Sequence, residues 1–397
     1  MQSAGHCKIW TLSENQNEYE RFERFLSGEN KHHVNVSEIN AALLEQSLTK
    51  LSGQLSITVI HDPSDIRKPH SSKMEDLDQV RSLGGKMIPG YKTFSSVALD
   101  EDRKQIHLLS CLPKAATETE ESGLDSPTFR QQPFTQITQI SQSLRAANPQ
   151  AVLTHVMDRE YDDQACFELI DKELGDQFVI RLKLNRISSE KAWDEKKGKE
   201  VSLKLKARQL RNRFTQSYET FSWGGRVYPQ VKAHFSYETI EIAGGTYGLV
   251  KVELRTRKGK KIFKEPMVLL SNFFPTNEAI ALLIFRSYLR RAKIEGVFKF
   301  LKEHMGWESF QVRELLTIQH IIVLCFFIGG FFYEIESELT QNPWMVQLCQ
   351  FGGGKGKVTK VYFLRGLAKI ANYLQISAFM RKNNLTEEQM IQLFQEE

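Results

Sequence analysis

The chain has 397 residues, and its 53 lysines and arginines outnumber its 48 aspartates and glutamates, so the formal net charge is +5. Hydrophobic residues make up 41% and charged residues 25%, which is an ordinary globular composition and excludes disordered, collagen-like and coiled-coil chains. At roughly 150 residues per domain, this length predicts two or three domains, or one domain with a large insertion. The five cysteines form no CxxC motif, so we expect neither a zinc site nor a disulfide framework.

The hydropathy pattern indicates no membrane segment. The first 20 residues are polar and lack the apolar stretch of a signal peptide. The most apolar run, residues 321–333, has about 13 residues, whereas a membrane span needs about 20. We therefore expect a buried helix there, no membrane partner and a cytoplasmic location.

The first half of the chain predicts helices at the N-terminus and then a mixture of strands and helices. Helical spacing of apolar residues predicts helices over residues 18–26, 36–51, 133–147 and 162–174. Alternating and β-branched runs predict strands over residues 55–60, 90–99, 105–110, 151–157 and 177–184. Residues 64–85 are expected to form a polar loop, and residues 115–130 an acidic surface linker. This order predicts an α/β fold around a mixed sheet.

The second half begins with a strongly basic segment. Residues 181–213 hold twelve lysines and arginines against four acids, a local net charge of +8. Apolar runs then predict strands over residues 226–235, 239–242, 247–255 and 267–270. A long helix is expected over residues 277–304, followed by a helical end and a glycine- and lysine-rich loop at 351–357. This half is therefore expected to hold a basic, β-rich insertion.

Two aspartates occupy positions where α/β proteins place ligands. Asp62 and Asp158 each follow an apolar strand, and ligands in open α/β sheets bind at the carboxyl ends of strands. An aspartate at such a position, taken alone, is more often a turn or helix-capping residue than a metal ligand. Two carboxylates from neighbouring strands would suit Mg²⁺, which prefers hard oxygen ligands.

The predicted long helix carries four chemically active side chains on one face. At 100° per residue, Tyr288, Arg291, Glu295 and Lys302 fall within about 60° of arc, opposite the apolar residues. The simplest explanation is a solvated face on which Arg291 and Glu295 form an ion pair one turn apart. The alternative is a functional face.

The spacing Tyr-x2-Arg-x3-Glu-x6-Lys resembles the Y-R-E-K signature of DDE transposases from bacterial insertion sequences of the IS-four type. Asp158-Arg159-Glu160 is similar to the second-aspartate motif of that family, and Phe178-Val-Ile-Arg181 to the strand that follows it. Asp62 matches the first aspartate, although Asp65 stands three residues further on and is the alternative. The resemblance covers about residues 50–310.

This resemblance implies a ribonuclease-H-like catalytic core, interrupted by a β-rich insertion and flanked by helical N- and C-terminal regions. It implies that Asp62, Asp158 and Glu295 are catalytic and hold two Mg²⁺ ions, for which Mn²⁺ can substitute. Tyr288, Arg291 and Lys302 are implied to grip DNA phosphates, with Arg181 as a further DNA-binding residue. Trp223 in the insertion is implied to stack on a flipped base, although a tryptophan in a hairpin is more often a core residue.

The implied activity is cut-and-paste transposition of an insertion sequence, with end nicking, a hairpin step and strand transfer. The implied partners are double-stranded DNA, both transposon ends and target, and a second copy of the chain in a paired-end homodimer of a bacterial, nucleoid-associated protein. The implied domains are residues 1–50 (helical, DNA-binding), 51–185 and 273–310 (the core), 186–272 (the insertion) and 311–397 (helical). Two alternatives stay open: a decayed or domesticated transposase that only binds DNA, and a ribonuclease-H-like nuclease without strand transfer.

Overall fold

The computed structural model describes residues 16–27, 35–100, 102, 104–114, 131–186, 193–194, 199–200, 202–223, 225–384 and 386. The chain divides into two units. The first comprises Met1–Asn40, Asp65–Tyr91 and Val297–Glu397, and the second comprises Ala41–Ser64 and Lys92–Gly296. The predicted acidic linker at 115–130 lies outside the described residues.

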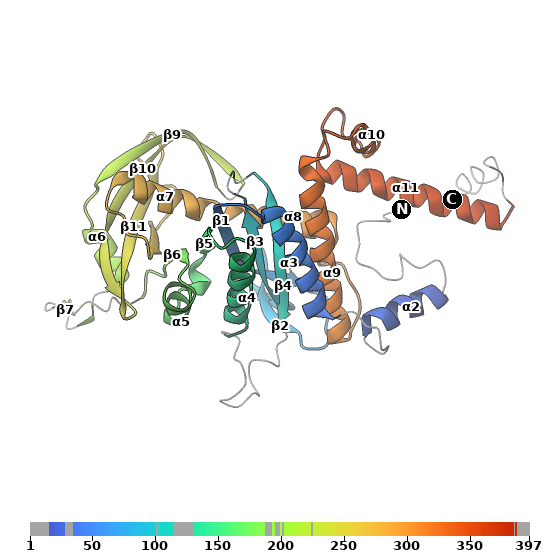
Figure 1. Ribbon diagram of the computed structural model, residues 1–397, viewed down its shortest axis with the longest axis horizontal. Helices are drawn as coiled ribbons and strands as arrows, with labels where there is room; N and C mark the ends of the chain where they lie inside the picture. Colours follow the sequence, from blue (N-terminus) through green and yellow to red (C-terminus); the bar gives the residue numbers. More distant parts are fainter. Residues whose placement is uncertain are drawn as a thin grey trace. The chain divides into compact units, whose positions relative to one another are not determined.

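A large mixed sheet forms the second unit (Figure 1). Its strand order is β3-β1-β5-β6-β12-β11-β10-β9, with β4 also paired to β3. The strands span β1 Ser56–Arg67, β3 Met87–Leu99, β4 Ile106–Lys114, β5 Val152–Met157, β6 Gln177–Arg181, β9 Phe214–Trp223, β10 Arg226–Ile242, β11 Gly245–Arg255 and β12 Met267–Ser271. The β1, β5 and β6 strands run parallel, whereas β6, β12, β11, β10 and β9 pair antiparallel in turn. The sheet therefore continues without a break from the parallel centre into the predicted insertion.

Helices bury the apolar residues of this sheet in two clusters. Helices α3 (Val36–Leu51) and α4 (Gln131–Ala147) supply Leu51 and Leu144, which pack against Ile57 of β1 and Leu153 of β5. A second cluster joins β6, β11 and β12 to a helical stretch made of a 3-10 turn (Arg159–Tyr161), α5 (Gln164–Glu168) and a π turn (Leu169–Glu173). Helix α6 (Leu203–Gln209) adds Leu203 and Ala207 to it. The single helix expected over 162–174 is thus two shorter pieces, α5 and the π turn.

The first unit is mainly helical. It contains α2 (Gln16–Ser27), α9 (Leu315–Glu334), a 3-10 turn (Ile335–Ser337), α10 (Pro343–Phe351), α11 (Lys360–Lys382) and the later part of α8 (Ala292–His304). The short strand β2 (Asp78–Arg81) pairs with the start of β3. By length and composition, Leu315–Ser337 is the one segment of the described chain that could cross a membrane, but 61% of its most apolar window is buried. A core helix gives the same pattern.

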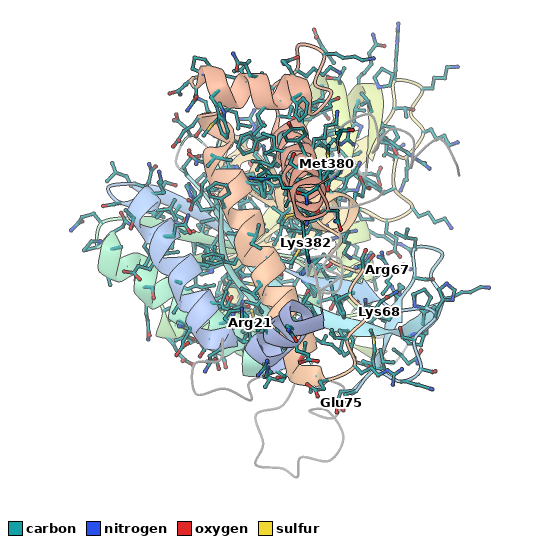
Figure 2. The ribbon with its side chains drawn as sticks, turned by 90° about the vertical axis from the view of Figure 1, so that its right-hand side faces the viewer. Arg21, Arg67, Lys68, Glu75, Met380 and Lys382 are labelled. Carbon is teal, nitrogen blue, oxygen red and sulfur yellow. The ribbon has the colours of Figure 1, made fainter. Side chains whose placement is uncertain are left out.

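Two close contacts explain sequence features of the first unit. A Cβ atom at Gly352 would lie 2.0 Å from the Tyr362 carbonyl oxygen, and one at Gly366 would lie 2.1 Å from that of Leu348, so only glycine lets α10 and α11 approach this closely. Within the 351–357 loop, Gly352 therefore serves packing, whereas Gly353 and Gly356 adopt positive φ angles of 90° and 86°. After β1, the buried Lys68 donates to the carbonyl oxygens of Glu308 and Phe310 at 2.8 and 2.6 Å; Figure 2 labels it beside Arg67.

Several boundaries differ from the sequence prediction. The first strand does not end at Ile60: β1 continues to Arg67, and β2 forms within the expected loop at 64–85. Strand β9 was not predicted, and the strands expected at 226–235 and 239–242 form the single strand β10. Most of these differences arise in antiparallel hairpins, because β2 pairs with β3 and β10 pairs with both β9 and β11. Cross-strand pairing extends these strands beyond the apolar runs that predict them.

Candidate active site

The register of the parallel strands places Asp62 and Asp158 at neighbouring positions. In the β1–β5 pair, His61 lies opposite Met157, so the next residue of each chain segment is one of the two aspartates. Asp62 is buried and Asp158 is half-buried. Asp158 accepts a hydrogen bond from the Glu160 backbone N–H at 2.7 Å, which makes it the cap of the 3-10 turn as well. The structure therefore brings together the two aspartates chosen from the sequence.

The long helix expected over 277–304 is two helices. Helix α7 spans Glu278–Leu289 and α8 spans Ala292–His304. At the junction the backbone N–H groups of Arg290 and Arg291 bond to residues three positions earlier, Ser287 and Tyr288, which is the spacing of a tighter 3-10 turn. The prediction of one continuous helix was wrong, because no proline or glycine in the sequence marks this break.

Arg291 lies in the junction and joins two of the predicted carboxylates. Its Nη1 donates to both carboxylate oxygens of Asp62, at 2.8 and 2.7 Å. Its Nη2 donates to Oε1 of Glu295 in a second ion pair. The ion pair between Arg291 and Glu295 that the simplest interpretation expects is thus present, and Asp62 is added to it. Arg291, at the junction of α7 and α8, therefore links Asp62 of β1 to Glu295 of α8.

Burial and charge act against each other at Asp62. Burial raises the pKa of Asp62 to about 8, although the neighbouring Arg291 guanidinium opposes the rise, and the charges of Asp158 and Glu295 add to it. A carboxyl group whose pKa is raised by two other carboxylates lies within electrostatic reach of both. Asp62, Asp158 and Glu295 therefore form one acidic neighbourhood whose repulsion a cation would relieve.

The donor set fits a hard divalent cation, because all three side chains offer carboxylate oxygens. Among the described residues, however, no three acidic, histidine or cysteine side chains already lie close enough together to hold a metal ion. Two of the three carboxylates are engaged by Arg291. A metal ion in this site would therefore have to displace the guanidinium from some of these carboxylate oxygens.

The predicted stripe of Tyr288, Arg291, Glu295 and Lys302 does not form one exposed face. Tyr288 is fully buried, and its ring stacks on Trp223 with centroids 6.3 Å apart. The change of pitch at the junction turns Tyr288 toward the core, while Glu295 is 46% exposed. The prediction that Tyr288 shares an open face with Glu295 was wrong, because the arc calculation assumed a single regular helix.

The burial of Tyr288 gives a stability prediction. Its hydroxyl is buried and forms no hydrogen bond with any described residue. Because an unsatisfied buried hydroxyl costs free energy, Tyr288→Phe should leave the free energy of unfolding unchanged or raise it by up to about 1 kcal/mol. Tyr288→Ala should lower it by about 3–5 kcal/mol through the cavity that it leaves. Urea denaturation of both variants beside the wild type measures this, and a clear loss in Tyr288→Phe would contradict it.

Lys302 and Asp65 lie together in the first unit. The Lys302 Nζ donates to the Asp65 backbone oxygen at 2.6 Å and pairs with Glu308 at 3.3 Å. Burial, partly offset by Glu308, lowers the pKa of Lys302. The Asp65 carboxylate accepts the Arg81 backbone N–H at 3.2 Å. Both residues thus have internal partners, whereas the Asp62 carboxylate faces Arg291.

The other two predicted DNA contacts lie in the sheet. Arg181 ends β6, and since Met157 pairs with Ile180, Arg181 lies beside Asp158 in the register. Trp223 ends β9 and is half-buried; its ring stacks on Tyr288 and meets the Phe263 ring in a T-shaped contact with centroids 5.7 Å apart. Arg181 is therefore a register neighbour of Asp158, and the position of Trp223 is that of a packing residue.

Sequence reasoning missed a buried polar chain behind the aspartates. His61 accepts from Ser96 at 2.7 Å and contacts His155 at 2.9 Å, and His155 contacts Asp176 at 3.0 Å. Burial, together with His155, lowers the pKa of His61 well below its ordinary value, so this imidazole is neutral. One proton on each Nε2 atom satisfies the whole chain up to the Asp176 carboxylate. His61 and His155 lie among the apolar residues of β1 and β5, at positions that face the core. A polar side chain at such a position is the sequence signal that could have revealed this chain of hydrogen bonds.

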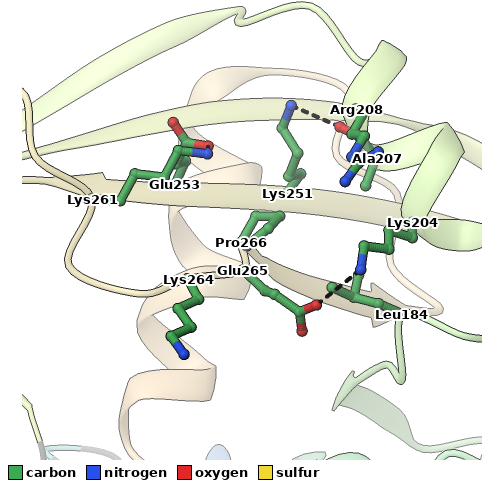
Figure 3. Close-up of a pocket in the computed structure, with 10 residues that line it drawn as sticks. All are labelled: Leu184, Lys204, Ala207, Arg208, Lys251, Glu253, Lys261, Lys264, Glu265 and Pro266. Carbon is green, nitrogen blue, oxygen red and sulfur yellow. Dashed lines mark hydrogen bonds and ion pairs between the residues drawn. The ribbon is translucent and has the colours of Figure 1, made fainter.

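A basic groove lies on the sheet beyond β6. It has a volume of about 280 Å³ and is lined by Leu184, Lys204, Ala207, Arg208, Lys251, Glu253, Lys261, Lys264, Glu265 and Pro266 (Figure 3). Glu265 pairs with Lys204 at 3.4 Å, and Glu253 with Lys261 at 2.7 Å. Five cations against two acids leave the groove with a net charge of +3. The predicted positive charge of the insertion is thus partly concentrated in one concave surface.

The sequence matches the transposase DDE domain family over residues 54–328, so the chain belongs to this family. It is a transposase with a ribonuclease-H-like α/β core, a nucleic-acid-cleaving enzyme of a family that generally uses divalent metal ions. No curated protein matches the sequence. Among solved structures, the chain is similar to the NurA nuclease from Sulfolobus solfataricus, at 11% identity and a TM-score of 0.28, over 83% of this chain and 100% of that one. So loose a similarity says nothing about the reaction of either protein.

Proposed function

We propose that this transposase carries out metal-dependent cut-and-paste transposition of a bacterial insertion sequence of the IS-four type. The observation that carries the proposal is the convergence of Asp62, Asp158 and Glu295 from two strands and a helix on one electrostatic neighbourhood. All three carboxylates lie within residues 54–328, which match the transposase DDE domain.

The three carboxylates would hold Mg²⁺ or Mn²⁺, as two ions. When bound, these ions would neutralise the charge that develops on a phosphate during displacement. The protein's own contribution is positioning: β1 carries Asp62, the end of β5 leads into Asp158, and α8 carries Glu295. Asp62 rather than Asp65 is the first ligand in this proposal, since the pairing of His61 with Met157 makes Asp62 the neighbour of Asp158.

Cationic side chains near the carboxylates would hold the DNA. Arg291 and Arg181 would grip phosphates beside the cut, with a fork of donors that suits two oxygens at once. Tyr288 and Lys302 would have to leave the internal contacts described above to act in the same way, and Trp223 would have to leave its packed position to stack on a base. The groove at Lys204 and Lys264 would carry sequence-independent phosphate contacts.

The DNA steps proposed are nicking of each transposon end, a hairpin at the end and strand transfer into target DNA. Glu295 would be needed at every step, whereas loss of Arg291 would spare the first nick and stall the hairpin. The enzyme would act in the bacterial cytoplasm at the nucleoid, without a membrane partner. The domain division proposed is residues 1–50, 51–185, 186–272, 273–310 and 311–397.

A paired-end complex requires two protein chains, because two ends are cut and joined together. We therefore expect a homodimer on DNA, with the apolar region from Leu315 onward as its contact. Light scattering of the protein with end DNA should give two chains per two ends. A complex with one chain that still performs strand transfer would contradict this expectation.

The experiment that tests the function uses a donor plasmid with the inverted repeats that flank the reading frame, a target plasmid and Mg²⁺. A cut-and-paste transposase releases the element from the donor and joins it to the target. Cleavage without joining would favour a ribonuclease-H-like nuclease, and end binding without cleavage would favour a decayed or domesticated transposase. Each of these results would overturn the proposal.

A further inference from the structure

The proposed function leaves one feature of the site unexplained, namely the position of the Arg291 guanidinium between two carboxylates. The guanidinium of Arg291 takes both oxygens of Asp62 and one oxygen of Glu295. Its Nε is buried and has no hydrogen-bond partner among the described residues. The two carboxylates are thus what holds this side chain in place.

Burial makes these contacts strong. The side chain of Arg291 is 13% exposed and that of Asp62 is 8% exposed, so water screens the pair weakly. The two terminal nitrogens of the guanidinium bind different carboxylates, Nη1 that of Asp62 and Nη2 that of Glu295, which the single ammonium nitrogen of a lysine could not reproduce. The ion pair is therefore a built feature of the site.

A divalent cation needs the same oxygen atoms. Mg²⁺ and Mn²⁺ bind carboxylate oxygens directly and at short range, and an oxygen that accepts from Arg291 has to turn away from the guanidinium to bind the ion fully. Two cations that share one pair of carboxylates also repel each other across a partly buried space. The guanidinium and a metal ion would thus compete for the carboxylate oxygens of Asp62.

We propose that Arg291 is a positioning residue that competes with the divalent cation for Asp62 and Glu295, and so sets the affinity of the site for metal. The inference rests on the proposed function, since it takes these two carboxylates as ligands. It adds a role for Arg291 that precedes any contact with DNA. The guanidinium that leaves the carboxylates becomes available to a phosphate.

The test measures Mn²⁺ binding by the full chain without DNA, and the paramagnetic resonance signal of the free ion reports how much Mn²⁺ is unbound. Arg291→Ala should bind Mn²⁺ about tenfold more tightly than the wild type. Arg291→Lys, which keeps the charge but not the fork, should lie between the two. The matched control is Lys293→Ala, which removes an exposed cation two residues away that pairs with no acid among the described residues, and it should bind like the wild type.

Arg291→Met, which keeps the apolar stem, gives the same measurement if Arg291→Ala does not fold. Asp62→Asn identifies the site, because Mn²⁺ binding there should be lost. Suppose that the wild type binds Mn²⁺ in a way that depends on Asp62, but that Arg291→Ala and Arg291→Met bind it no more tightly. This result would overturn the proposed competition and leave the metal assignment standing. Absence of any Asp62-dependent binding in all variants would overturn the metal assignment and the inference with it.

Discussion

Asp62→Asn, Asp158→Asn and Glu295→Gln should each reduce Mg²⁺-dependent nicking of an element end by roughly a thousandfold or more. The reason is that a metal held by these oxygens contributes several kcal/mol to the displacement, and each amide removes one negative ligand. DNA binding should stay within about threefold of the wild type, because affinity comes mainly from phosphate contacts. Nicking of a labelled end and gel-shift binding, measured on the same preparations, check both parts.

Two neighbouring acids serve as controls for this result. Asp65→Asn changes a carboxylate three residues from Asp62 that accepts a backbone N–H, and Glu303→Gln changes an exposed acid on the same helix as Glu295. Both should retain nicking. An active Asp62→Asn beside an inactive Asp65→Asn would move the first ligand to Asp65, and mild defects in all three main variants would refute the catalytic assignment.

Asp176→Ala should lower the free energy of unfolding by about 3–5 kcal/mol. Asp176 is 2% exposed and accepts from Ser141, His155 and Arg145. Burial alone would raise the pKa of Asp176, but the hydrogen bonds from His155 and Ser141, together with the charge of Arg145, outweigh it, so the pKa lies below its ordinary value. Removal of this carboxylate leaves buried donors without a partner, which is a strongly destabilising change.

The comparison variant is Arg145→Ala. Its side chain is 38% exposed, so water replaces part of what the substitution removes, and the loss should be about 1 kcal/mol. Urea denaturation of the two variants and the wild type gives the difference. If the two losses were equal, or Asp176→Ala cost less than about 1 kcal/mol, the buried chain from His61 to Asp176 would not stabilise the sheet as described.

Local patterns predicted much of the central sheet. Strands β3, β5 and β12 and helices α3 and α4 lie within a few residues of their expected positions, because their apolar side chains recur at the period of the element. Asp62 and Asp158 stand out in the sequence because each follows an apolar run, and the register of β1 and β5 places them side by side. The role of these residues in catalysis is still a prediction.

The sequence by itself determined the family, the α/β class and the carboxylates that are candidates for the site, because these depend on residue identity, order and local period. Only the tertiary structure decided that the helix breaks at Arg291, that Tyr288 is buried and that one guanidinium joins Asp62 to Glu295. Nothing between residues 277 and 304 encodes the break locally. It becomes favourable only when β1 presents a buried carboxylate for Arg291 and Trp223 covers Tyr288, and both partners come from more than 60 residues earlier in the chain.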